Sequence, residues 1–305
     1  MKNANRIGST SQWANGKGKS WLSKRLAWPW LVLILTAGLL VLGARVAWAL
    51  NYAGNISVNA TMGQLSPNPI RVGDTATASL SASYNQPSNV PEGTYPTADY
   101  SWSVAVEYKP LYADSYGVPP TNSYTLTISP SQPSSTSGAT ITFTPLIAGY
   151  WQFTATCGVT LTDQAGNDYW TGSGTSSAVQ ATSMQVDLVV SVDGTQLTEA
   201  QETDPGVQLP QLPQYQGYAP PPLPVFTATQ VAPADCTATL NWTNPSDLVV
   251  ESTSGATLTT GQQIPLTGGA FSFYAYTAPS SGAAGQTVAF SVTATAASGA
   301  TMQDK

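Results

Sequence analysis

Acidic side chains are the first candidates for chemistry in this chain, because the chain contains no histidine. Without an imidazole, neither a Ser-His-Asp system nor a histidine-ligated metal can form. Glu199, Glu202 and Asp204 cluster in the sequence, with Asp187 and Asp193 shortly before them. Paired carboxylates can hydrolyse glycosides when a cleft holds them about 5–10 Å apart. No aromatic platform accompanies these acids, so a solvated loop is predicted, with a calcium site of non-EF-hand spacing as the alternative.

A second group of oxygen-bearing side chains lies at a predicted hairpin tip. Asp163, Asn167 and Asp168 carry the side-chain oxygens that calcium prefers. The same residue types form turns without any metal, and turn formation alone explains them here. We therefore expect no metal and no cofactor, and these three residues are the candidates if calcium does bind.

Aromatic residues near predicted loops are the other candidates for a site. Tyr112 and Tyr116 lie in an irregular segment, and Tyr169 and Trp170 follow the hairpin tip. We expect these rings to cover the ends of a hydrophobic core, as large aromatics usually do. Exposed rings of this kind also stack on sugars, so these four are the candidate ligand-binding residues if a glycan does bind. Lys109, next to Pro110, is predicted to be a surface strand end, and no catalytic residue is assigned.

The first 49 residues have the features of a secretory signal peptide. Seven of the ten Lys and Arg residues precede residue 50, and no Asp or Glu does. Residues 26–43 are apolar apart from Thr36, and Ala47 and Ala49 then match the small-x-small pattern of a cleavage site. The alternative is an uncleaved anchor, because this apolar run is barely long enough to cross a bilayer. In both cases the upstream basic residues place the rest of the chain outside.

The chain beyond Ala49 is sparsely charged and acidic. Charged residues make up 9% of the chain, against about 25% in ordinary soluble domains. Beyond Ala49, three basic residues stand against sixteen acidic ones, a net charge of −13. This charge repels nucleic acid and anionic membrane surfaces. We expect no nucleic-acid partner, and a membrane contact only through an uncleaved N-terminal segment.

Apolar and polar side chains alternate through most of the exported part. Every second residue from Trp151 to Leu161 is apolar, and the same holds for residues 76–84 and 102–108. A period of two is typical of half-buried antiparallel strands. Clusters of Gly, Pro, Asn and Asp, such as residues 66–69 and 163–167, punctuate the runs as turns. No amphipathic helical window of useful length follows residue 50, so the predicted fold class is all-β.

The alternating runs form two groups, which predicts two domains. The second group begins after Met184 with the run from Val186 to Val192. Residues 205–224 hold seven prolines. Proline has no backbone N–H to donate to a neighbouring strand, so this run is not expected to form a central strand. We predict domain 1 over residues 50–183 and domain 2 over residues 184–305, with the Pro-rich run as an insertion at 205–224. The alternative places the boundary inside the Pro-rich run, so that the strand at Val186–Val192 ends domain 1.

Four motifs lie along the first half of the exported part. They are Val72-Gly73-Asp74-Thr75, Trp102 on an alternating run, Ala148-Gly149-Tyr150-Trp151-Gln152-Phe153 and the turn Thr162-Asp163-Gln164-Ala165-Gly166. Together they resemble the bacterial immunoglobulin-like and PKD-like domains of secreted and surface proteins. The resemblance covers roughly residues 55–180, and the second half follows it more loosely through residues 238–242 and 288–292. It implies two antiparallel β-sandwiches. It says almost nothing about function, because this sandwich hosts many unrelated roles.

The two cysteines depart from the antibody-type pattern. A disulfide of that type would join Cys157 to a cysteine on the strand that carries Ala78 and Leu80, and none is present there. Cys157 and Cys236 each occupy a predicted core-facing position of an alternating strand, and the two strands belong to different predicted domains. We expect two buried thiols, and the oxidising compartment leaves an inter-domain disulfide as the alternative.

Three classes of function are compatible with these features. A non-catalytic structural or adhesive protein, secreted or at the cell surface, needs only stable and weakly charged sandwiches. A carbohydrate- or calcium-dependent binding module would use the aromatic or acidic candidates, with surface proteins or glycans as partners. An enzyme would need Asp, Glu, Lys or Tyr as its general base, because histidine is absent. We expect the first class, keep the second as the alternative, and expect no enzyme.

Overall fold

The computed structural model describes most of the chain beyond residue 53. The described residues are 54–86, 97–162, 168–203, 206–210, 223–243, 248–266, 269–277 and 287–305. They all belong to the unit from Gly54 to Lys305, while residues 1–53 form a separate unit outside the description. The predicted cleavage residues Ala47 and Ala49 therefore lie outside the described residues.

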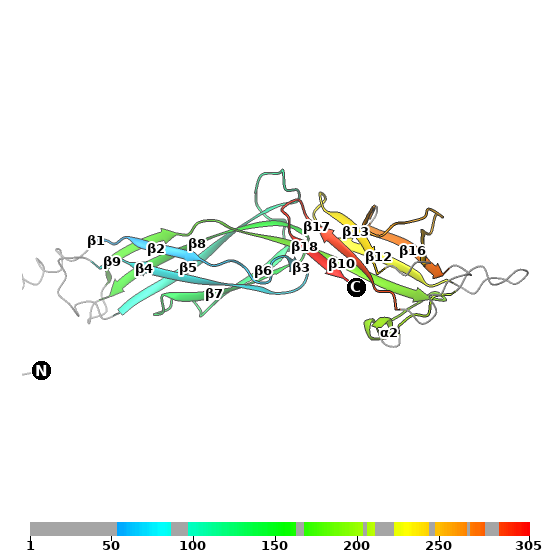
Figure 1. Cartoon of the computed structure of the whole chain (residues 1–305). Helices are drawn as coiled ribbons and strands as arrows, with labels where there is room; N and C mark the ends of the chain where they lie inside the picture. The colour runs from blue at the N-terminus through cyan, green and yellow to red at the C-terminus, as the bar shows by residue number, and fades with distance from the viewer. Residues whose placement is uncertain are drawn as a thin grey trace, which may run out of the picture. The chain divides into compact units, whose positions relative to one another are not determined.

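The first half of the described chain forms two facing sheets (Figure 1). One sheet has the order β2-β4-β7-β6, and the facing sheet contains β5, β8 and β9, with the short β1 added in parallel to β9. Their bounds are β1 Gly54–Asn55, β2 Val58–Met62, β4 Ala76–Tyr84, β5 Thr97–Lys109, β6 Tyr124–Ser129, β7 Gly138–Pro145, β8 Gly149–Thr162 and β9 Asp168–Thr175.

This strand order is that of an immunoglobulin constant-type domain. In chain order the seven main strands correspond to A through G. The sheet β2-β4-β7-β6 is then A-B-E-D, and β5, β8 and β9 are C, F and G. Trp102 lies on β5, the C position, directly opposite Cys157 on β8, the F position. The predicted sandwich is confirmed, and Trp102 lies buried on a strand that pairs with β8.

The second half repeats the seven-strand arrangement with short additional strands. One sheet has the order β10-β12-β16-β14, and the other has the order β15-β13-β17-β18. With β15 set aside as an added edge strand, these are again A-B-E-D and C-F-G. The bounds are β10 Val179–Val192, β12 Val225–Val231, β13 Thr237–Trp242, β14 Leu248–Ser252, β15 Gln262–Ile264, β16 Ala270–Thr277, β17 Phe290–Thr295 and β18 Thr301–Asp304. The all-β class with two immunoglobulin-like sandwiches is therefore observed.

Strand β10 belongs to both sandwiches. Its first part, Val179–Ser183, pairs with β8 of the first sandwich, and its second part, Gln185–Ser191, pairs with β12 of the second. Short strand β3 (Ile70–Arg71) adds to it in parallel where the two parts meet. The strand thus runs without interruption through the predicted boundary at 183/184, which we retain as a proposal.

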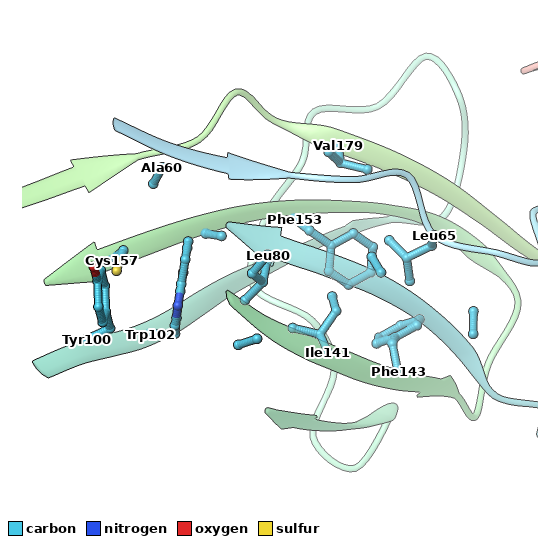
Figure 2. Packing of buried hydrophobic residues seen from close by; sticks show 14 of the residues in the cluster. Ala60, Leu65, Leu80, Tyr100, Trp102, Ile141, Phe143, Phe153, Cys157 and Val179 are labelled. Carbon is cyan, nitrogen blue, oxygen red and sulfur yellow. The ribbon is translucent and has the colours of Figure 1, made fainter. Parts of the chain in front are cut away.

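Each sandwich encloses its own hydrophobic cluster. In the first, Phe143 of β7 and Phe153 of β8 meet across the sheets, with ring centroids 4.8 Å apart. Figure 2 shows these rings together with Leu80, Ile141 and Trp102 between the two layers. Every second residue of β8 from Trp151 to Leu161 is buried, as its alternation predicts. Burial of such large side chains stabilises by about 1.5–3 kcal/mol each.

The second cluster is built in the same way. Phe226 of β12 and Phe290 of β17 lie on facing sheets with ring centroids 4.8 Å apart, and Phe273 of β16 stacks on Phe226 at 5.1 Å. Val186, Leu188 and Val190 of β10 point into this cluster. That placement makes the second part of β10 the opening strand of the second sandwich.

The segment after β10 is partly helical rather than a plain loop. After the short strand β11 (Thr195–Gln196), residues Glu199–Thr203 form the five-residue helix α2. Gln201 Oε1 accepts hydrogen bonds from the backbone N–H and the hydroxyl of Thr198, which stabilises the first turn of the helix. The expectation of a loop at Glu199 and Glu202 was wrong in this respect, because one helical turn is too short to show a 3.6-residue period.

Candidate functional site

Lys109, at the end of β5, lies beneath three tyrosine rings. Lys109 is only 7% exposed, so the expectation that it lies at an exposed strand end was wrong. The ammonium nitrogen lies 4.5 Å from the ring centroid of Tyr112, 4.7 Å from that of Tyr116 and 5.5 Å from that of Tyr150. It also donates a hydrogen bond to the backbone carbonyl of Tyr112. A partly desolvated cation over aromatic faces contributes about 0.5–2 kcal/mol per favourable contact.

The segment after β5 folds back over the end of its own strand. The backbone groups of Tyr108 and Gly117 exchange two hydrogen bonds of 2.8 and 2.9 Å, which closes the intervening residues into a loop. Within the loop, the carboxylate of Asp114 accepts a hydrogen bond from the backbone N–H of Leu111. The loop therefore brings Tyr112 and Tyr116 over Lys109.

Asp235 connects this aromatic group to the second sandwich. It lies in the turn between β12 and β13. One carboxylate oxygen accepts a hydrogen bond of 2.6 Å from the Tyr150 hydroxyl, and the other accepts one of 2.7 Å from the backbone N–H of Tyr112. The Tyr150 hydroxyl in turn accepts a hydrogen bond of 3.2 Å from the backbone N–H of Ala297. We call Lys109, Tyr112, Tyr116, Tyr150 and Asp235 the junction cluster.

Tyr150 is the residue through which the two cores meet. It lies on β8 of the first sandwich, but its ring, 2% exposed, packs in the second hydrophobic cluster. Burial raises the pKa of its hydroxyl well above 10.0, and the hydrogen bond to Asp235 and the charge of that carboxylate add to the effect. Burial also raises the pKa of Tyr116.

Stability is expected to fall above pH 10 because Tyr150 resists ionisation. In the unfolded chain its hydroxyl loses its proton near pH 10, while in the folded protein it keeps the proton to higher pH. Its contribution is therefore complete below pH 10 and is lost as the pH rises beyond it. Urea unfolding at pH 8 to 12 measures this slope, which Tyr150→Phe should flatten. An unchanged slope in Tyr150→Phe would contradict the assignment.

A pocket of about 360 Å³ opens beside the junction cluster. Tyr112, Tyr116 and Tyr150 line it together with polar residues of the first sandwich, and the turn between β17 and β18 closes it from the second. The hydroxyls of Thr182 and Ser298 form a hydrogen bond of 3.1 Å across this boundary. Two of the four predicted ligand-binding residues, Tyr112 and Tyr116, are thus brought together in one pocket.

The other two predicted ligand-binding residues lie elsewhere. Trp170 packs against the first hydrophobic cluster, opposite Leu161 of β8, and is not among the residues of the pocket. Leu161 and Tyr150 are eleven residues apart on one strand, which corresponds to about 36 Å. Tyr169 is in β9, but its side chain lies outside the described residues, as do Asp163 and Asn167 and the side chain of Asp168.

The described acidic residues near β10 contact protein groups. Glu202 Oε1 accepts a hydrogen bond of 2.9 Å from the backbone N–H of Val190, and Asp304 Oδ2 accepts one of 2.7 Å from that of Leu188. Asp187 forms an ion pair with Arg71 of β3. Within the described part of the chain, no three His, Cys, Asp or Glu residues are placed to hold a metal ion.

Both cysteines are free thiols. Cys157 is buried in the first core, and burial raises its pKa to about 11. Cys236 is only partly buried, contrary to expectation, because it precedes β13 at the edge of the second cluster. Burial, followed by the charge of Asp235, raises its pKa to about 11 as well. Neither thiol is therefore activated for nucleophilic chemistry near neutral pH.

Comparisons with known proteins give structural likenesses only. No family model matches the chain. No curated protein matches it either. Domains 5–6 of the S-layer protein SbsC are 11% identical with a TM-score of 0.19, and cover 81% of this chain and 94% of theirs. The BspA C-terminal domain of Streptococcus agalactiae is 10% identical with a TM-score of 0.21, and covers 82% and 98%.

A fragment of intimin, in complex with its translocated receptor, is 10% identical with a TM-score of 0.28, and covers 81% of this chain and 61% of that one. All three are β-rich domains of bacterial surface proteins. The fold assignment rests on the strand orders of the two sandwiches.

Within the described residues, no helix has the length and apolar character needed to span a bilayer.

Proposed function

We propose that this chain is an exported, non-catalytic protein with a structural or adhesive role at the cell surface or in the secreted fraction. The observation that carries the proposal is strand β10, which pairs with β8 of one sandwich and β12 of the next. Two sandwiches that share a strand have no flexible linker between them. Force or binding at one sandwich is therefore transmitted to the other through backbone hydrogen bonds, as a structural or adhesive role requires.

The placement of the chemically capable residues supports a role without catalysis. Lys109, a candidate general base, lies beneath three tyrosine rings and is bonded to a carbonyl oxygen. Glu202 and Asp304 accept hydrogen bonds from the backbone of β10. The sequence has no histidine to replace them. We also propose that the sandwiches are PKD-like and that the chain is cleaved after Ala49.

Export of the full chain in a bacterial host tests the proposal. With a tag after Lys305, the processed protein should be found outside the cytoplasm, shortened by residues 1–49. Replacing both Ala47 and Ala49 by Asp should leave the longer, membrane-associated precursor, because signal peptidase needs small residues at these positions. Ala53→Asp is the matched control and should be processed normally.

Two results would overturn the proposal. Retention of the tagged chain in the cytoplasm would contradict an exported role. Turnover by the purified protein on a panel of glycosidase, esterase and protease substrates would contradict a non-catalytic one.

A further inference from the structure

The pocket beside the junction cluster is lined by neutral groups. Beside the three tyrosines, Asn68 and Gln180 contribute amides and Thr182 contributes a hydroxyl. The Asn68 amide oxygen also accepts a hydrogen bond from the backbone N–H of Thr182, and the Thr182 hydroxyl is bonded to that of Ser298, so a ligand would use their remaining donor and acceptor positions. Lys109 and Asp235 are not among its lining residues. Both are bonded to Tyr112, and Asp235 is bonded to Tyr150 as well. A ligand would therefore meet hydroxyls, amides and phenol rings, with no described charge to pair with.

These groups favour one class of ligand. A sugar presents hydroxyls that exchange hydrogen bonds with amides and hydroxyls, and an apolar face that packs on an aromatic ring. Tyr112 is 49% exposed as a residue, and the Lys109 ammonium lies over its ring, so a sugar would have to pack on the face away from Lys109. An anion would be repelled by the net charge of −13 beyond Ala49. The Lys109 ammonium and the Asp235 carboxylate behind the rings are already bonded to Tyr112, so neither is free to pair with a charged ligand. The volume of about 360 Å³ lies in the lower part of the range of ligand pockets, about 300–1,000 Å³.

We propose that this pocket binds a neutral mono- or disaccharide. The proposal rests on the adhesive form of the proposed function, because it supplies the glycan contact that adhesion needs. The ligand would touch both sandwiches, since Ser298 and Ala300 of the second sandwich line the same pocket. Binding is thus expected to stabilise the junction between them.

Titration of the full chain with four probes tests the proposal. The neutral probes are methyl glucoside, methyl galactoside and N-acetylglucosamine, and N-acetylneuraminic acid is the anionic one. Amide NMR signals of Thr182 and Ala300 should shift in a saturable manner with at least one neutral probe, in the millimolar range. Ala300→Trp, which fills the pocket, and Tyr112→Ala should each weaken binding by about tenfold or more. Tyr274→Ala, on β16 and outside the pocket, is the matched control.

The outcomes separate clearly. If Ala300→Trp disturbs the fold, a second variant decides. Gln180→Ala removes an amide from the pocket without adding bulk, and it must weaken the binding of the same probe. The proposal is overturned if no neutral probe gives saturable shifts, if binding survives Ala300→Trp, or if N-acetylneuraminic acid binds more tightly than the neutral sugars. These results would leave the export and turnover experiments unaffected, so failure here is distinguishable from failure of the structural or adhesive role.

Discussion

Replacing Trp151 by alanine should reduce the free energy of unfolding by about 3–5 kcal/mol, the cost of deleting a large buried ring. The Trp151 side chain is fully buried, and its ring centroid lies 4.8 Å from that of Tyr108 and 5.1 Å from that of Phe143. Its Nε1 donates a hydrogen bond of 2.7 Å to Ser183 Oγ, which itself donates one of 2.8 Å to the carbonyl oxygen of Ile147. The substitution removes both the packing and the donor that satisfies a buried hydroxyl.

Urea unfolding followed by circular dichroism measures this loss. Val118→Ala is the matched control, because Val118 is 94% exposed and its truncation should change stability by no more than about 0.5 kcal/mol. Trp151→Phe should give an intermediate loss, since it keeps an aromatic ring but removes the donor to Ser183. A loss below about 1 kcal/mol in Trp151→Ala would show that the first core repacks around the site, contrary to its close ring contacts.

Alternation in the sequence predicted which face of each strand is buried, because the alternating pattern lies within the strand itself. In β8 every residue from Trp151 to Leu161 at a spacing of two is buried, as expected. Tyr150, next to Trp151, points the other way and is also buried, because the second sandwich covers that face. Alternation within one strand cannot show that its polar face is buried by residues far away in the chain. The adjacent pair of large aromatics was the available signal.

The junction cluster was missed for the same reason. Lys109 ends an alternating strand and precedes a proline, which indicates an exposed strand end. The loop that returns from Tyr108 to Gly117 covers it, and Asp235 joins it from more than a hundred residues away. Near the predicted boundary, four successive buried residues from Ala181 to Met184 interrupt the alternation of β10. That interruption marks the passage of one strand between two cores, and it was visible in the sequence as a shift of the alternation by one residue, from odd to even positions.

Replacing Asp235 by alanine should loosen the side-chain contacts at the junction of the two sandwiches and destabilise the protein by about 2 kcal/mol. The change leaves the buried Tyr150 hydroxyl without its acceptor, and a buried polar group without a partner costs about 1–3 kcal/mol. It also removes the acceptor for the Tyr112 N–H, which anchors the loop over Lys109. Hydrogen exchange measured by mass spectrometry should show faster exchange in the turn at Ala297–Ala300 and around Tyr112, with the centre of β8 unchanged.

Asp99→Ala is the matched control, because it removes the same charge from an exposed position on β5. A double-mutant cycle then isolates the contact between Asp235 and Tyr150. If the two side chains act mainly through their 2.6 Å hydrogen bond, Tyr150→Phe in the Asp235→Ala background should cost much less than it does alone. Additive losses, or exchange rates at the junction that match those of the wild type, would mean that β10 alone holds the sandwiches together. The shared strand would then be sufficient for mechanical coupling, and the junction cluster would serve the pocket rather than the connection.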